Sequence, residues 1–186
     1  MTVVETIGAT VEPVNIQEGI SQLRLTSDSG EDAIVKDMIS ASRAYLEDHT
    51  GLSLASRTLR MTLDSFPDVI ELTKGPVTSI TSISYYDTDN ALQTINVGTE
   101  IISDLDSIPA RITPLVDGDW PDTQDRINAV SVVYVAGYTP ANIPKKLKMA
   151  ILAGLSHYYD NRGDKNVHFP SWILTIVESC RTNQFV

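Results

Sequence analysis

The sequence contains a single cysteine, Cys180, so no disulfide can form within the chain. Such a chain is typical of a reducing compartment. No apolar run approaches the length of about 18 residues that a membrane-spanning helix needs, so we expect no membrane span. The first residues, Met-Thr-Val-Val-Glu-Thr, lack a basic segment followed by a long apolar run, so we also expect no signal peptide.

Positive charge is scarce as well. The 186 residues include 14 Lys and Arg against 24 Asp and Glu, which gives a formal net charge of −10 at pH 7. Electrostatic attachment to nucleic acid normally requires a basic patch. A protein of this charge next to DNA would let the DNA pass rather than hold it. Acidity that serves only solubility explains the composition equally well.

Catalytic motifs are missing too. None of the histidines, His49, His157 and His168, lies in a motif with a nucleophile. The sequence has no Gly-x-Ser-x-Gly, no His-Glu-x-x-His and no Gly-rich phosphate-binding loop. We therefore predict no catalytic residue, and we expect that the protein is not an enzyme.

Aspartates gather in short segments that raise the question of a metal site. Asp87-x-Asp89 begins like a calcium loop, but Ala91 and Leu92 stand where a ligand and the glycine should be. Because Asp hydrogen-bonds its own backbone in turns, we expect turns, no metal and no cofactor. The other acidic groups that we considered are Asp104 with Asp106, and Asp117, Asp119, Asp122 and Asp125.

Helical periodicity is strongest in residues 144–162. Pro144 suits the first helical position, and Gly163 supplies a stop. One broad apolar face is formed by Leu147, Ile151, Gly154 and Tyr158. After a polar break, residues 170–177 show a weaker helical pattern, and residues 181–186 are expected to form a tail.

Two further helices are predicted near the N-terminus. Asn15 and Glu18 form a capping box that starts a short helix ending near Leu25. The second helix is predicted from about Gly30 to His49. We expect its main apolar stripe at Ile34, Met38, Ala41 and Tyr45, widened by Ile39 and Leu46.

Alternation of polar and apolar residues begins after Ser56 and predicts strands. Residues 128–136 are apolar at nearly every position, which is typical of a central strand. The other strands are expected at residues 58–64, 69–72, 77–86, 92–97, 100–103 and 110–113.

This order of elements predicts an α+β protein, a small helical bundle with an inserted antiparallel β domain. Two N-terminal helices and the long C-terminal helix would form the bundle. The predicted segments are an N-terminal extension with a helical hairpin (1–54), the β domain (55–140), the long helix (141–163), and a short helix with a tail (164–186).

Several segments, in their order and spacing, resemble one known family. They are Glu12–Ile16, Ser42–Gly51, Leu63–Pro67, Ile70–Val77, Pro109–Arg111, Trp120–Pro121, Val133–Tyr138 and His157–Arg162. Over most of residues 12–162 the chain resembles the head–tail connector (adaptor) proteins of tailed bacteriophages. Residues 163–186 match this family poorly.

The resemblance implies a structural virion protein of the neck, made in the bacterial host cytoplasm. Such proteins form a ring, commonly dodecameric, that docks on the portal protein and extends the DNA channel. The ring then offers an attachment surface to the next neck or tail-completion protein. DNA passes through it without sequence-specific binding. The family has no catalytic residues, and its C-terminal segment often reaches toward the portal.

Two sets of residues are predicted to make contacts in such an assembly. Val35 and Ile39 lie off the main stripe of the second helix and are candidates for the subunit interface, because a ring needs heterologous contacts. Aromatic residues near the C-terminus suggest anchoring on a partner, although they could also pack on their own bundle. The portal-contact candidates are Phe169, Trp172, Arg181, Phe185 and Val186.

Two other classes of function stay open. A free-standing binding module would use the β insertion to hold a ligand or glycan, with a concave site lined by Tyr85, Tyr86, Trp120 and Tyr138. A small hydrolase that uses the Asp-rich loops and a metal is the third class.

Overall fold

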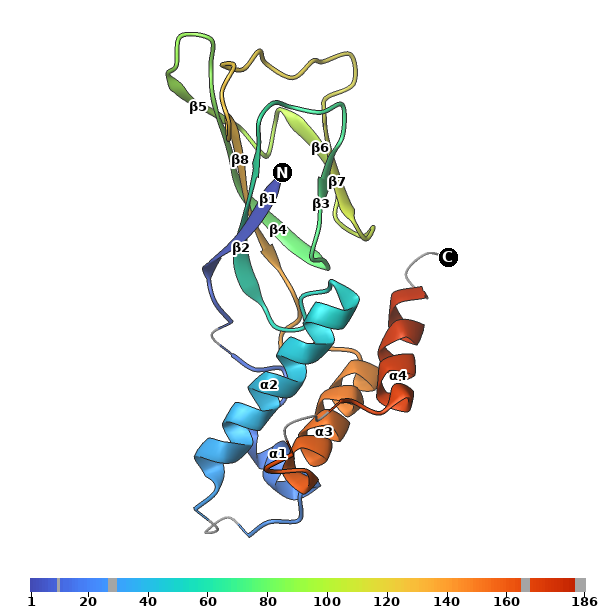
Figure 1. Cartoon of the computed structure of the whole chain (residues 1–186). Coiled ribbons are helices and arrows are strands. Elements are labelled where there is room, and N and C mark those ends of the chain that lie inside the picture. Colours follow the sequence, from blue (N-terminus) through green and yellow to red (C-terminus); the bar gives the residue numbers. More distant parts are fainter. Residues whose placement is uncertain (10, 27–29, 165–167, 183–186) are drawn as a thin grey trace. The chain divides into compact units, whose positions relative to one another are not determined.

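The structure, a computed structural model, describes residues 1–9, 11–26, 30–164 and 168–182, with side chains up to Ser179. The chain divides into two compact units, which are described separately. The β unit comprises Met1–Thr10 and Ser56–Gly137, and the helical unit comprises Val11–Ala55 and Tyr138–Val186. The residues that the structure describes form four helices and two antiparallel sheets (Figure 1), so the predicted α+β class is confirmed.

The helical unit contains α1 (Ile16–Gln22), α2 (Asp32–Thr50), α3 (Lys145–Asp160) and α4 (Ser171–Thr182). The predicted capping box starts α1, since the Asn15 side chain accepts from the Glu18 N–H at 2.9 Å and Glu18 accepts from the Asn15 N–H. Gly51 ends α2 in the left-handed conformation, at φ 71°.

Two helix boundaries differ from the prediction. Pro144 has an extended backbone and is the N-cap of α3, so the helix begins one residue later than expected. The last helix, α4, continues to Thr182, so the expectation that a tail begins at Arg181 is wrong.

The buried face of α2 differs from the predicted stripe by one residue position. Val35, Ile39, Ser42 and Leu46 are buried, whereas Ile34 and Ala41 are exposed and Met38 and Tyr45 are half-buried. The reason is the close approach of two other helices, α1 at Gly19 and α3 at Gly154, whose added Cβ would meet Ser42. A Cβ built on Gly19 would lie 2.9 Å from side-chain carbons of Val35 and Ile39.

The β unit contains two sheets. The five-stranded sheet has the order β1-β2-β8-β4-β5, and the three-stranded sheet has the order β3-β7-β6. The strands are β1 (Thr2–Ile7), β2 (Arg57–Leu63), β3 (Ile70–Leu72), β4 (Val77–Tyr86), β5 (Leu92–Ile95), β6 (Ile101–Asp104), β7 (Ala110–Pro114) and β8 (Val130–Ala136). The predicted central strand, β8, lies between β2 and β4, as Figure 1 shows.

Side chains from both sheets form one hydrophobic core. Alternate residues of β8 point into it, and Val130, Val132, Tyr134 and Ala136 are all buried. The Tyr134 hydroxyl donates a hydrogen bond to the Thr73 carbonyl at 2.6 Å. Burial outweighs this bond and raises the pKa of Tyr134 to about 12.

The N-terminal segment lies in a different unit from the one expected. Thr2–Ile7 forms β1, which pairs antiparallel with β2 over the register Thr2–Thr62 to Ile7–Thr58. Residues 1–10 therefore belong to the β unit, whereas the prediction placed them with the helical hairpin. Without β1, the N–H and C=O groups along that edge of β2 would have no strand partner.

Candidate functional site

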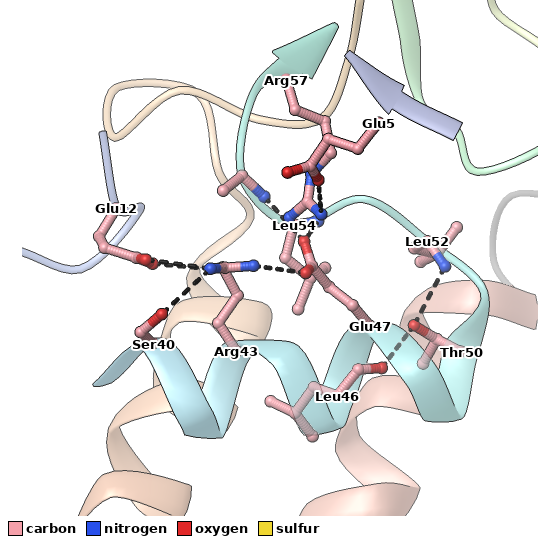
Figure 2. Close-up of polar contacts among 11 residues, drawn as sticks. Glu5, Glu12, Ser40, Arg43, Leu46, Glu47, Thr50, Leu52, Leu54 and Arg57 are labelled. Atoms are coloured by element: carbon pink, nitrogen blue, oxygen red, sulfur yellow. Dashed lines mark hydrogen bonds and ion pairs between the residues drawn. The ribbon is translucent and has the colours of Figure 1, made fainter. Parts of the chain in front are cut away.

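A polar cluster around Arg43 joins distant segments of the helical unit (Figure 2). The Arg43 guanidinium binds Glu12 at 2.7 and 3.1 Å and Glu47 at 2.5 Å. Glu47 also accepts hydrogen bonds from the N–H groups of Leu54, at 2.7 Å, and Ala55, at 3.3 Å. The cluster therefore fixes, within this unit, two segments that lead along the chain into the β unit.

Arg43 is the cation of this cluster, and it is largely buried. Burial alone would lower its pKa, but hydrogen bonds and charge from Glu12 and Glu47 outweigh burial and raise the pKa of Arg43 above its ordinary value. Next to the cluster, the Thr50 hydroxyl donates to the Leu46 carbonyl at 2.7 Å and accepts from the Leu52 N–H. The hydroxyl groups of the arrangement, those of Ser40 and Thr50, bind Arg43 and the backbone, so the cluster serves to hold the local structure.

The predicted interface residues Val35 and Ile39 lie in the core of the helical unit. They are 0% and 2% exposed, and they contact α1 at Gly19. Their side chains are therefore not available to a neighbouring subunit in this conformation. The apolar row that α2 does expose is the one that includes Ile34 and Ala41.

The portal-contact candidates have different positions. Phe169 is 5% exposed, and its ring packs on Tyr45 at 4.3 Å and on Tyr158 at 5.0 Å between centroids. It is thus anchored in its own unit, which is the alternative that the sequence left open. Trp172 is 56% exposed at the start of α4. The backbone of Arg181 lies in α4, but the structure does not describe its side chain. Phe185 and Val186 lie outside the described residues.

The outer face of the five-stranded sheet carries a row of hydroxyl groups across all five strands. The register aligns Thr2, Thr62, Ser131, Ser84 and Thr94. A second row aligns Val4, Arg60, Val133 and Ser82. None of the residues in these two rows carries a carboxylate. These two rows therefore present hydroxyl, apolar and Arg60 side chains on that face.

The aromatic residues proposed to line a ligand site do not all share one surface. Tyr85 and Trp120 line a hollow of about 370 Å³ in the β unit. The Trp120 ring stacks on Phe66 at 4.7 Å between centroids, so it is held by packing. Tyr86 points to the opposite face of the sheet from Tyr85, with Arg126 4.0 Å from its ring centroid. Tyr138 belongs to the helical unit and is buried.

Asp87 and Asp104, two of the aspartates considered as metal ligands, accept hydrogen bonds within their own turns. Asp87 accepts from the N–H groups of Asp89 and Ala91 and from the Gln93 side chain at 2.7 Å. The Gln93 bond, with those backbone bonds, lowers the pKa of Asp87. Among the residues that the structure describes, no three His, Cys, Asp or Glu side chains are grouped so that they could hold a metal ion.

Asp104 offers a direct test of this turn chemistry. Its carboxylate accepts from Arg111 at 2.5 Å and from the Ser107 hydroxyl at 2.7 Å, and the Arg111 bond is the main reason that its pKa is lowered to about 2. We expect Arg111→Ala to raise the pKa of Asp104 toward 3.8, as measured by an NMR titration. Because the folded pKa is depressed, this contact stabilises the fold above about pH 4 and is lost as the pH falls through about 2.

The control for this titration is Arg126→Ala, which removes an arginine that lies over Tyr86. It should leave the titration of Asp104 unchanged. If Asp104 titrates at the same pH with and without Arg111, the described contact does not set its pKa.

The fold has clear relatives among solved structures. A chain in the virion of the native gene transfer agent (GTA) particle matches with a TM-score of 0.76 and 22% identity, covering 96% of this chain and 94% of that chain. A chain in the neck of the empty GTA particle, computed with C6 symmetry, matches with a TM-score of 0.74 and 22% identity over the same shares. A chain in the neck of the native GTA particle, computed with C12 symmetry, gives 0.70 and 21%, again over the same shares.

These matches cover nearly the full length of both partners, and at this level of identity they establish a shared fold. No protein-family model matches the sequence, and no curated protein matches it either. In the part of the chain that the structure describes, every helix is too short or too polar to cross a membrane.

Proposed function

We propose that this protein is a structural, non-enzymatic component of the neck of a phage-like particle, a head–tail connector (adaptor). The observation that carries the proposal is the near full-length fold match to chains from GTA particles, two of them from the neck. The family resemblance of residues 12–162 supports the same assignment independently of the fold.

In this role the protein forms a ring of identical copies between the head and the tail. The C6 and C12 symmetries of the related necks support a ring of this kind, and twelve copies fit the family. The ring docks on the portal protein, extends the DNA channel and presents a surface to the next neck or tail protein. A net charge of −10 on each copy keeps the DNA free to pass.

The C-terminal region is the part that we assign to the portal contact. Trp172 is exposed and available, and Arg181, Phe185 and Val186 follow it along the chain. Phe169 contributes indirectly, because its packing on Tyr45 and Tyr158 fixes the start of α4.

Co-sedimentation of the full chain with its cognate portal ring tests the proposal. We expect the chain to sediment with the portal, and we expect deletion of residues 183–186 to weaken binding while the circular dichroism spectrum stays unchanged. Trp172→Ala should weaken binding in the same way. A full chain that ignores the portal would contradict the proposed role, and undiminished binding of both variants would contradict only the assigned contact.

One observation supports the alternative function, a free-standing binding module. Tyr85 and Trp120 line a hollow of about 370 Å³, which is within the usual size of small-molecule sites. A ligand screen of the full chain, followed through the fluorescence of its tryptophans, would identify such a ligand. Loss of the response in Tyr85→Ala would locate the ligand in the hollow.

A further inference from the structure

The exposed apolar row of α2 forms one side of a hollow in the helical unit, which we call the α2 hollow. It has a volume of about 530 Å³ and lies between the first half of α2 and the end of α3. Ile34, which is 43% exposed, forms part of its apolar wall. The lining is completed by Asp37, Met38, Ala41, Tyr158, Asn161, Arg162, Gly163 and Asp164.

The α2 hollow offers one exposed carboxylate to a partner, that of Asp37 on α2. Its lining also includes Asp164, which has a contact within the chain, and one arginine, Arg162. Arg162 is already engaged, since it lies 3.3 Å from Glu31 and 3.9 Å from the centroid of the Tyr159 ring. The hollow therefore suits a partner that combines an apolar side chain with positive charge.

The first turns of α3 present such a surface, which we call the lysine patch. It consists of Lys145, Lys146 and Met149, all exposed, with Met149 at 63%. The first turn of α3 contains no acidic residue, and Pro144 provides no side-chain cap. Lysines at the positive end of a helix are unfavourable for the helix itself, so its own stability does not explain them.

The neighbouring Lys148 behaves differently. It forms an ion pair with Glu18, which links α3 to α1 within the same chain. For Lys145 and Lys146, no ion pair is seen with any residue that the structure describes. The chain has only 14 lysines and arginines, so two adjacent lysines beside the exposed Met149 make the lysine patch unusual on an otherwise acidic protein.

The α2 hollow and the lysine patch cannot meet within one chain. Met149 and Tyr158 are nine residues apart on α3, which corresponds to about 14 Å along the helix axis and about two and a half turns. The two side chains therefore point to opposite sides of the helix, near its opposite ends. Contact between the two surfaces requires a second copy of the chain.

We propose that the lysine patch of one copy docks in the α2 hollow of the next. Met149, a flexible side chain, enters the apolar part, and Lys145 and Lys146 lie opposite Asp37. The contact is heterologous, because each copy uses two different surfaces, and its repetition around a closed rotation gives a ring. This inference rests on the proposed function, and it names the subunit interface of that ring.

Charge reversal and its rescue test the interface. We would compare self-association of the full chain, of D37K and of K145E/K146E by sedimentation velocity over a concentration series. Each variant alone should associate at least about tenfold more weakly than the original chain, since like charges then face each other. An equimolar mixture of the two variants should recover association, because every contact in an alternating assembly again pairs opposite charges.

The control is Lys74→Glu, which reverses an exposed lysine in the β unit and should leave association unchanged. Failure of the mixture to recover, unchanged association of both variants, or a full chain that stays monomeric at every concentration would overturn the interface. Portal binding is measured separately on the same proteins. If D37K and K145E/K146E still form the ring on the portal, this interface is rejected and the neck role stands. If the original chain does not bind the portal, the neck role is rejected.

Discussion

Replacing Ile39 with Asp is expected to unfold the helical unit. The side chain is 2% exposed and touches α1 at Gly19, so the variant would bury a carboxylate in an apolar core. We expect a loss of at least about 4 kcal/mol in the free energy of unfolding. Urea denaturation followed by far-ultraviolet circular dichroism measures this loss.

The matched control is Ile34→Asp, on the same helix. Ile34 is 43% exposed, so the same change of residue should cost no more than about 0.5 kcal/mol of stability. Its effect should instead appear in self-association, since Ile34 lines the α2 hollow. A stable Ile39→Asp protein that fails to assemble would show that Ile39 is accessible, which was the expectation from the sequence.

Arg43→Met should cost about 3 to 5 kcal/mol of stability, because it removes the ion pair between Arg43 and the buried carboxylate of Glu47. Glu12 would lose its partner as well. Thermal and urea denaturation would measure this loss of stability. The matched control is Arg60→Met, at an exposed position of β2. The Arg60 variant should stay within about 0.5 kcal/mol of the original protein.

A second variant separates the lost charge from the lost packing. In Arg43→Met with Glu47→Gln, the amide oxygen can still accept from the Leu54 N–H, and no unpaired charge is buried. We expect this double variant to recover part of the lost stability. Equal stability of Arg43→Met and the original protein would mean that the cluster contributes little to the fold.

Local signals in the sequence were sufficient for most elements. The Asn15 capping box and the apolar run of β8 each depend on neighbouring residues, and both are found where they were predicted. The choice between the two apolar rows of α2 depends on a different chain segment. Apolar residues occur in both rows, and the approach of Gly19 on α1 decides that Val35 and Ile39 are buried.

Long-range partners explain the other differences. The pairing of β1 with β2 joins residues more than 50 positions apart, so the local sequence of residues 2–7 does not reveal the unit to which they belong. Arg43 and Glu12 are 31 positions apart, and nothing in their local sequence indicates the ion pair. Phe169 packs on Tyr45 from a region with a weak pattern, so its burial could not be predicted either.

Electron-microscopy image classification of the full chain mixed with its cognate portal ring tests the central claim most directly. We expect a closed ring of copies, coaxial with the portal, with a rotational symmetry of twelve or a divisor of it. Portal rings without added density, together with a free monomeric chain, would contradict the connector role. The search for a ligand in the hollow beside Tyr85 and Trp120 would then take precedence.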